Sequence, residues 1–210
     1  MKKKIVLILC AAVMLAAFCL SAVMISNANQ VVREYDTLSA LSNKDDKLAV
    51  ALSTIYKRAG DVVLSLPHAG TTLTQTAVMK HFAGDGGALS YLNTNADVHL
   101  NNAYSAMDDI LVDFDNILTS YNVPASSSYR TKRSELSTLF SGLKSANTEL
   151  IRRTRTFISY SGSGYDSYYT AYCEQLQVVT DKFESASKKI GTEYDSFISG
   201  LMGEDYHLVQ

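Results

Sequence analysis

The amino-acid sequence opens with an apolar run that constrains the whole chain. It extends from Ile5 to Ile25 without a charged residue and directly follows Lys2, Lys3 and Lys4. In a helix that rises about 1.5 Å per residue, this run spans roughly the 30 Å hydrocarbon core of a bilayer. Because basic residues favour the cytoplasmic side of a membrane, we expect the amino terminus to stay in the cytoplasm. The rest of the chain should then lie outside the cytoplasm. The membrane itself is the first partner that we expect.

A cleaved secretory signal is the alternative to this anchor. Signal peptides also begin with lysines and an apolar run, and Ser26-Asn27-Ala28 offers small residues for cleavage after Ala28. The apolar stretch of a signal is usually about 7–15 residues long, which is shorter than the run seen here. We therefore favour a retained anchor over residues 1–28 and keep cleavage as an open alternative.

Beyond the anchor, apolar residues recur at alternating steps of three and four. This spacing is typical of a helix with a heptad-like apolar stripe, since a strand would alternate every second residue. We expect the first helix to end at Pro67, because proline disrupts a helix interior, and residues 67–72 to form a loop. The stripe consists of Val31, Glu34, Leu38, Leu41, Asp45, Leu48, Leu52, Ile55, Ala59, Val62 and Leu66.

Three more stripes of the same spacing follow, over residues 100–121, 136–157 and 169–197. A short helix over 73–83 and a glycine-rich turn over 84–87 precede them. Long helices that each carry one apolar stripe bury these stripes against one another, and short connections favour antiparallel neighbours. The sequence therefore predicts an all-α fold, an N-terminal transmembrane helix followed by an antiparallel four-helix bundle over residues 29–199, with a tail over 200–210.

Composition and motifs exclude several classes of function. Three of the 19 Lys and Arg residues precede the apolar run, so the remainder is mildly acidic against 21 Asp and Glu residues, which argues against nucleic-acid binding. The chain has no catalytic motif and no nucleotide-binding loop, and its four histidines are widely spaced. We therefore expect no catalytic residues, no cofactor, no metal site and no identifiable small-molecule ligand.

Two clusters are candidates for binding a partner. Arg152, Arg153 and Arg155 form a basic group, although such groups more often pair with acidic residues of neighbouring helices. Tyrosines combined with Ser and Gly are typical of adaptable contact surfaces, and they surround a turn near residue 162. The tyrosines nearest this turn are Tyr160, Tyr165 and Tyr168.

Three features of the chain resemble the LemA family of bacterial membrane proteins: the anchor that leads into a long helix, residues 55–63 (IYKRAGDVV) and residues 197–203 (FISGLMG). The Pro-Asn that follows the first of these motifs in the family is missing, and residues 160–172 resemble an insertion. The resemblance implies an N-terminal membrane helix and a helical extracytoplasmic body, and it implies no catalytic residues.

These observations favour a non-enzymatic, membrane-tethered scaffold or interaction module that binds other proteins of the cell envelope. The first alternative is a ligand-sensing or substrate-binding four-helix module, similar in shape to chemoreceptor sensor domains. The second is an enzyme or metal-binding bundle that uses the dispersed His and Asp residues.

Overall fold

The computed structural model describes residues 44–160 and 165–202, which contain helices and turns but no strand. The all-α prediction is confirmed over this part of the chain. The predicted anchor, with Lys2, Lys3, Lys4 and the run from Ile5 to Ile25, lies outside it. Within the described ranges no helix combines the length and the hydrophobicity needed to cross a membrane.

The helices form four rods, two of which contain a π-helical segment. The first rod is α2 (Lys44–Leu66), η1 (Pro67–Thr72) and α3 (Leu73–Phe82); the second is α4 (Ala88–Tyr91), η2 (Leu92–Ala96) and α5 (Asp97–Ser120). The third and fourth are α6 (Ser128–Ser159) and α7 (Tyr165–Met202). The last helix therefore extends into the predicted tail.

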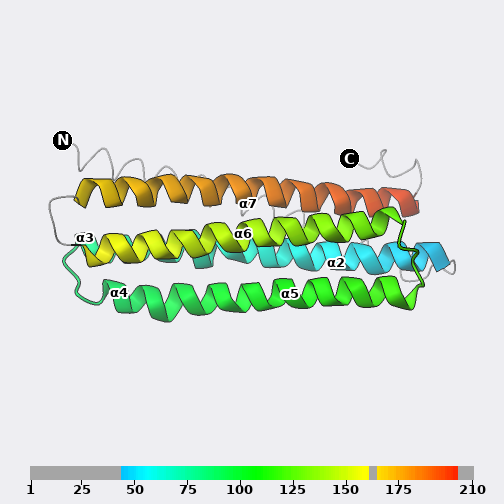
Figure 1. Cartoon of the computed structure of the whole chain (residues 1–210), viewed down its shortest axis with the longest axis horizontal. Helices are drawn as coiled ribbons and strands as arrows, with labels where there is room; N and C mark the ends of the chain where they lie inside the picture. Colours follow the sequence, from blue (N-terminus) through cyan, green and yellow to red (C-terminus); the bar gives the residue numbers. More distant parts are fainter. Residues whose placement is uncertain (1–43, 161–164, 203–210) are drawn as a thin grey trace.

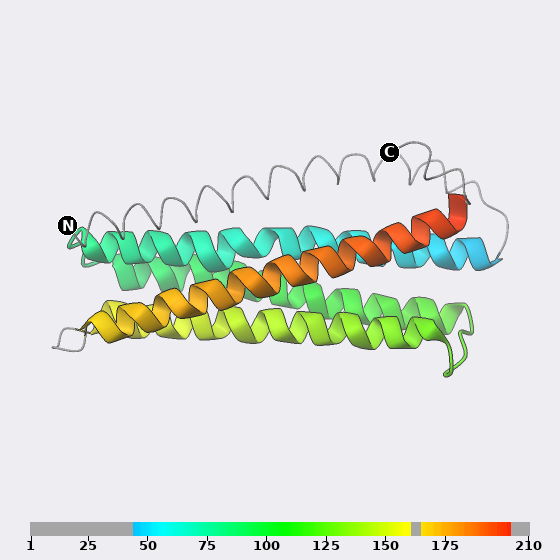
Figure 2. The ribbon, with the colours of Figure 1, turned by 90° about the horizontal axis from the view of Figure 1, so that it is seen from above.

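Consecutive rods run in opposite directions, so the described residues form an antiparallel four-helix bundle (Figure 1). Helix α7 lies obliquely across α2 and α6 (Figure 2). Its first half packs on α6, where Leu176 and Val179 share a cluster with Leu150, and its second half packs on α2, where Ile190 and Phe197 join the main core. The oblique course of α7 thus divides the core into two clusters.

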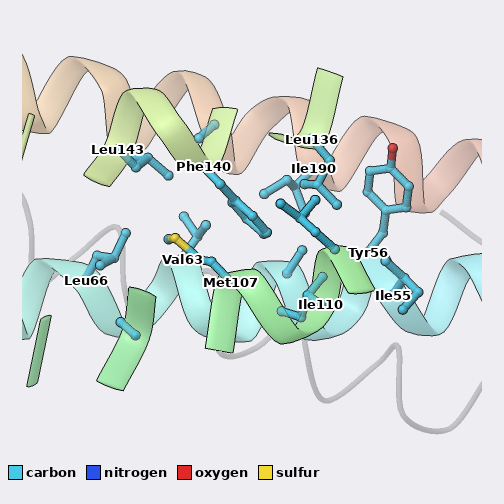
Figure 3. Close-up of a cluster of buried hydrophobic side chains, with 14 of the residues drawn as sticks. Ile55, Tyr56, Val63, Leu66, Met107, Ile110, Leu136, Phe140, Leu143 and Ile190 are labelled. Atoms are coloured by element: carbon cyan, nitrogen blue, oxygen red, sulfur yellow. The ribbon is translucent and has the colours of Figure 1, made fainter. Parts of the chain in front are cut away.

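The predicted stripes face this core. Leu52, Phe114, Leu136 and Ile190 are buried in the central cluster, part of which is shown in Figure 3. In α2 the stripe drifts by one position near its end, where Val62 is half-buried. Val63 is fully buried instead. The drift follows from the mismatch between 3.6 residues per turn and an average step of 3.5.

The prediction that Pro67 ends the first helix is wrong. The chain passes through Pro67 in a π-turn, in which the Leu73 amide donates to the carbonyl of His68, five residues earlier. A wider turn accommodates the proline ring and leaves carbonyl groups without their usual donors. Two threonine hydroxyls also hydrogen-bond to the backbone here: Thr71 donates to the Pro67 carbonyl, and Thr74 donates to the Gly70 carbonyl at 2.6 Å.

A turn lies at each end of the second rod, and the first of them confirms the glycine-rich turn predicted over residues 84–87. The first rod ends in a C-terminal cap in which Gly84 has a φ of 78° and the Asp85 amide donates to the Lys80 carbonyl. At the end of α5 the same motif uses Asn122, with a φ of 53°. The Val123 amide there donates to the Leu118 carbonyl. Glycine and asparagine tolerate this left-handed conformation better than other residues, so these caps end the helices where the sequence indicated.

Close packing at the π-turn explains a buried glycine. Gly70 faces the side chain of Asn147 in α6, and a Cβ atom at residue 70 would overlap Asn147 Oδ1. Asn147 is fully buried, and its Nδ2 donates to the Leu143 carbonyl at 2.9 Å. The first rod can approach α6 at this level only because residue 70 lacks a side chain.

Replacing Leu52 with alanine tests the register of the core. Leu52 is fully buried, so Leu52→Ala should lower the free energy of unfolding by about 2–5 kcal/mol through lost transfer energy and a residual cavity. Val112→Ala is the control, because Val112 is 57% exposed and should change stability by less than about 0.5 kcal/mol. Urea unfolding followed by circular dichroism measures both, and equal effects would show that Leu52 is not in the core.

Two identical substitutions should change stability in opposite directions. Gly191→Ala should raise the free energy of unfolding by up to about 1 kcal/mol, because alanine favours a helix and a Cβ there meets no atom within 4 Å. Gly70→Ala should lower it by about 1–3 kcal/mol, because the new methyl group overlaps Asn147. The same urea titrations compare them; stabilisation by Gly70→Ala would contradict the close approach of the first rod to α6.

Candidate functional site

Aromatic side chains gather at the end of the bundle where α3 and α6 finish and α4 and α7 begin (Figure 1). Phe157 of α6 is fully buried at the centre of this group. The distances from its ring centroid to those around it are 4.9 Å for Tyr165, 5.2 Å for Tyr169, 5.3 Å for His81 and 5.7 Å for Phe82. The rings therefore come from α3, α6 and α7 and fix these three elements together.

The outer side of this group is exposed to solvent. Phe82 is 48% exposed, Met79 is 43% exposed and Tyr168 is 36% exposed. Tyr168 also contacts Tyr160, with 4.3 Å between the ring centroids. We call this set the aromatic end; it comprises Met79, His81, Phe82, Phe157, Tyr160, Tyr165, Tyr168 and Tyr169.

Burial affects the chemistry of one tyrosine in the aromatic end. Desolvation raises the pKa of Tyr165, and the charge of Asp166 raises it further. Its hydroxyl is therefore neutral at physiological pH and can both donate and accept a hydrogen bond. This surface thus combines apolar rings with polar hydroxyl groups, as is common in protein contact surfaces.

The three arginines predicted as a binding group all have partners within the chain. Arg155 bridges to the second rod, where it pairs with Asp97 at 2.6 Å and donates to Asn93 Oδ1. Arg153 pairs with Glu149 at 2.8 Å and donates to the carbonyl of Ala171 in α7. These two side chains bind α6 to its neighbours.

Arg152 is the most exposed of the three, with 63% of its side chain accessible. Two of its nitrogens donate to the carboxylate of Glu149, each at 2.6 Å. Hydrogen bonds from Arg152 and then from Arg153 lower the pKa of Glu149 from 4.5 to about 2. Glu149 therefore neutralises part of the basic group, and Arg152 is the member whose side chain stays largely exposed.

Sequence reasoning identified the tyrosines but missed the contribution of α3. Met79, His81 and Phe82 join them because the first rod continues past Pro67 to the same end of the bundle. A signal was present in the sequence, since Met79 and Phe82 are three residues apart and precede a glycine-rich turn. The spacing places both side chains on one face of a helix.

The other chemical candidates are dispersed or paired. Besides Asp97, three aspartates of the second rod pair with basic residues of adjacent helices: Asp108 with Lys144, Asp113 with Arg58 and Asp115 with Arg133. Cys173 is half-buried and forms no disulfide in the part of the chain that the structure describes. Within the described residues, no three His, Cys, Asp or Glu side chains converge to hold a metal ion.

A small cavity of about 230 Å³ lies at the opposite end of the bundle, among Leu48, Tyr121, Asn122, Val123, Pro124, Ser127 and Tyr129. Its volume is below the usual range of about 300–1,000 Å³ for small-molecule sites. The Val123 carbonyl accepts from the Arg130 side chain at 3.0 Å, so a buried polar group there already has a partner. The cavity gives no particular support to a ligand-sensing function.

Comparison with known proteins gave no relative: no protein-family model, no curated protein and no solved structure matches the chain.

The depressed pKa of Glu149 predicts a pH-dependent contribution to stability. Because the folded-state pKa lies below the usual value, the ionised carboxylate stabilises the fold at pH above 4.5, and this contribution is lost as the pH falls toward 2. The unfolding free energy of wild type should exceed that of Glu149→Gln at pH 7, and the difference should shrink between pH 4.5 and 2. A constant difference across this range, measured by urea unfolding, would contradict the arginine pairing.

Proposed function

We propose that the chain is a membrane-anchored, extracytoplasmic helical-bundle protein of the LemA-like type that acts as a non-enzymatic scaffold or interaction module in the cell envelope. Its anchor is the apolar run from Ile5 to Ile25 behind the three lysines. Its contact surface for other envelope proteins is the aromatic end. The resemblance to the LemA family rests on the two sequence motifs and on the apolar run that leads into a long helix.

The direction of the first rod supports this assignment of the two ends. In the described part of the chain the first rod begins at Lys44, and residues 1–43 connect to it there. From Lys44 to Phe82 the helical rise amounts to about 57 Å. The aromatic end therefore lies at the opposite end of the bundle from Lys44, the first described residue.

The observation that carries the proposal is the exposure of Phe82, Met79 and Tyr168 around a rigid, buried ring. Exposed apolar side chains that are grouped together, rather than scattered singly, mark protein contact surfaces. Phe157 fixes Phe82 and the neighbouring tyrosines in place, which reduces the entropy cost of binding.

Site-specific photocrosslinking in intact cells tests the contact surface. A benzophenone side chain at residue 168 should form an adduct with one envelope protein, whereas the same group at Val178 should not. Val178 is a matched position because it lies in the same helix and is 41% exposed, close to the 36% of Tyr168. The crosslinked chain should be recovered in the membrane fraction.

A second substitution shows whether the adduct depends on the aromatic end. Phe82→Ala removes an exposed ring and should lower the yield of the residue-168 adduct several-fold, with the chain's abundance unchanged. The proposal fails if residue 168 forms no specific adduct, or if residues 168 and 178 capture the same proteins with equal yield.

A further inference from the structure

The π-turn brings together two histidines that are far apart in the sequence. His68 lies in η1 and His99 lies in α5, and their ring centroids are 5.9 Å apart with an angle of 78° between the ring planes. Both side chains are exposed. We propose that His68 and His99 bind one divalent transition-metal ion, of the class of Zn²⁺, Ni²⁺ or Cu²⁺, between the first and second rods.

The separation of the rings fits a shared metal ion. A metal 2.0–2.1 Å from one nitrogen of each imidazole sets the ring centroids about 5–6.5 Å apart, for angles at the metal between tetrahedral and linear. The observed 5.9 Å lies within this interval, so no movement of the backbone is required. Since both side chains are exposed, their rings can rotate to direct a nitrogen of each at the ion.

Close packing beneath the pair fixes its backbone. Gly70 follows His68 by two residues and Leu100 directly follows His99, and both are buried. A Cβ built on Gly70 lies 3.9 Å from Leu100 Cδ2, so η1 and α5 are in contact directly under the histidines. Packed helices therefore hold the backbone of both ligands in place. Metal binding then costs less conformational entropy than it would with flexible ligands.

The chemistry of the ligands determines which ions bind, and their number determines how many positions water fills. Among the described residues no third His, Cys, Asp or Glu completes the set, so water fills the remaining positions. Imidazole nitrogens suit Zn²⁺, Ni²⁺ and Cu²⁺, whereas Mg²⁺ and Ca²⁺ prefer carboxylate, carbonyl and water oxygens. The site is thus exchangeable, and its effect is to link the π-turn of the first rod to α5.

Titration of the full-length, detergent-solubilised chain without a histidine tag tests the site. Isothermal titration with NiCl₂ and ZnCl₂ should give one ion per chain, and each ion should raise the melting temperature. His68→Gln and His99→Gln should each weaken binding at least tenfold and abolish the thermal shift. His207→Gln removes an imidazole elsewhere in the chain and should bind as wild type does, and MgCl₂ should have no effect.

Melting curves without metal separate loss of the site from loss of the fold. The two exposed histidines contribute little packing, so both variants should melt with wild type in the presence of EDTA; if one variant unfolds, the other decides the question. The proposal is overturned if wild type binds neither ion, or if binding and the thermal shift survive either His68→Gln or His99→Gln. Loss of binding in His207→Gln would likewise overturn it.

Discussion

The structure depends on the π-turn that carries the first helix past Pro67. The Leu73 amide donates to the His68 carbonyl, five residues earlier, and the hydroxyls of Thr71 and Thr74 donate to the carbonyls of Pro67 and Gly70. A proline in a regular α-helix would end or kink it. The turn therefore extends α2 into α3, and three features follow from it: the length of the bundle, the ring cluster around Phe157 and the approach of His68 to His99.

The second rod also contains a π-helical segment, η2, which lies next to η1. In η2 the Asn95 side chain donates to the Tyr91 carbonyl at 2.8 Å, as the threonines do in η1. The two π-helical segments contact each other, and Gly70 beside Asn147 lets the first rod pack closely on α6 at this point. Helix α7 then crosses obliquely, packing on α6 near the aromatic end and on α2 near the other end. Burial of apolar side chains stabilises the packing of the rods. The π-turns let the first and second rods continue, and this continuity determines where the rods end.

Periodicity predicted the helices and their buried faces well, because each stripe is a local pattern. Leu52, Met107, Leu143 and Ile190 are buried as their spacing indicated. The break at Pro67 was predicted wrongly because proline usually ends a helix, whereas here the chain continues through a π-turn.

Only part of the candidate site was predicted, because sequence patterns report on residues that are close together in the chain. The tyrosines near residue 162 and the arginines of α6 are close in sequence, so local composition identified them. Phe82 and His81 reach them only through a helix that continues past Pro67, and the His68–His99 pair needs two rods side by side. Local sequence patterns do not encode such long-range contacts. The predicted membrane anchor lies outside the described residues and remains a prediction.

The continuity of the first rod is the central claim, and a distance between two spin labels tests it most directly. Labels at Lys47 and Met79, both exposed, are introduced as cysteines in a chain whose native cysteines are replaced by serine. An unbroken helix predicts a separation of about 48 Å between these two backbone positions, with a narrow distribution in pulsed electron paramagnetic resonance. A broad distribution, or a mean below about 35 Å, would show that the chain bends at Pro67 and would contradict the account.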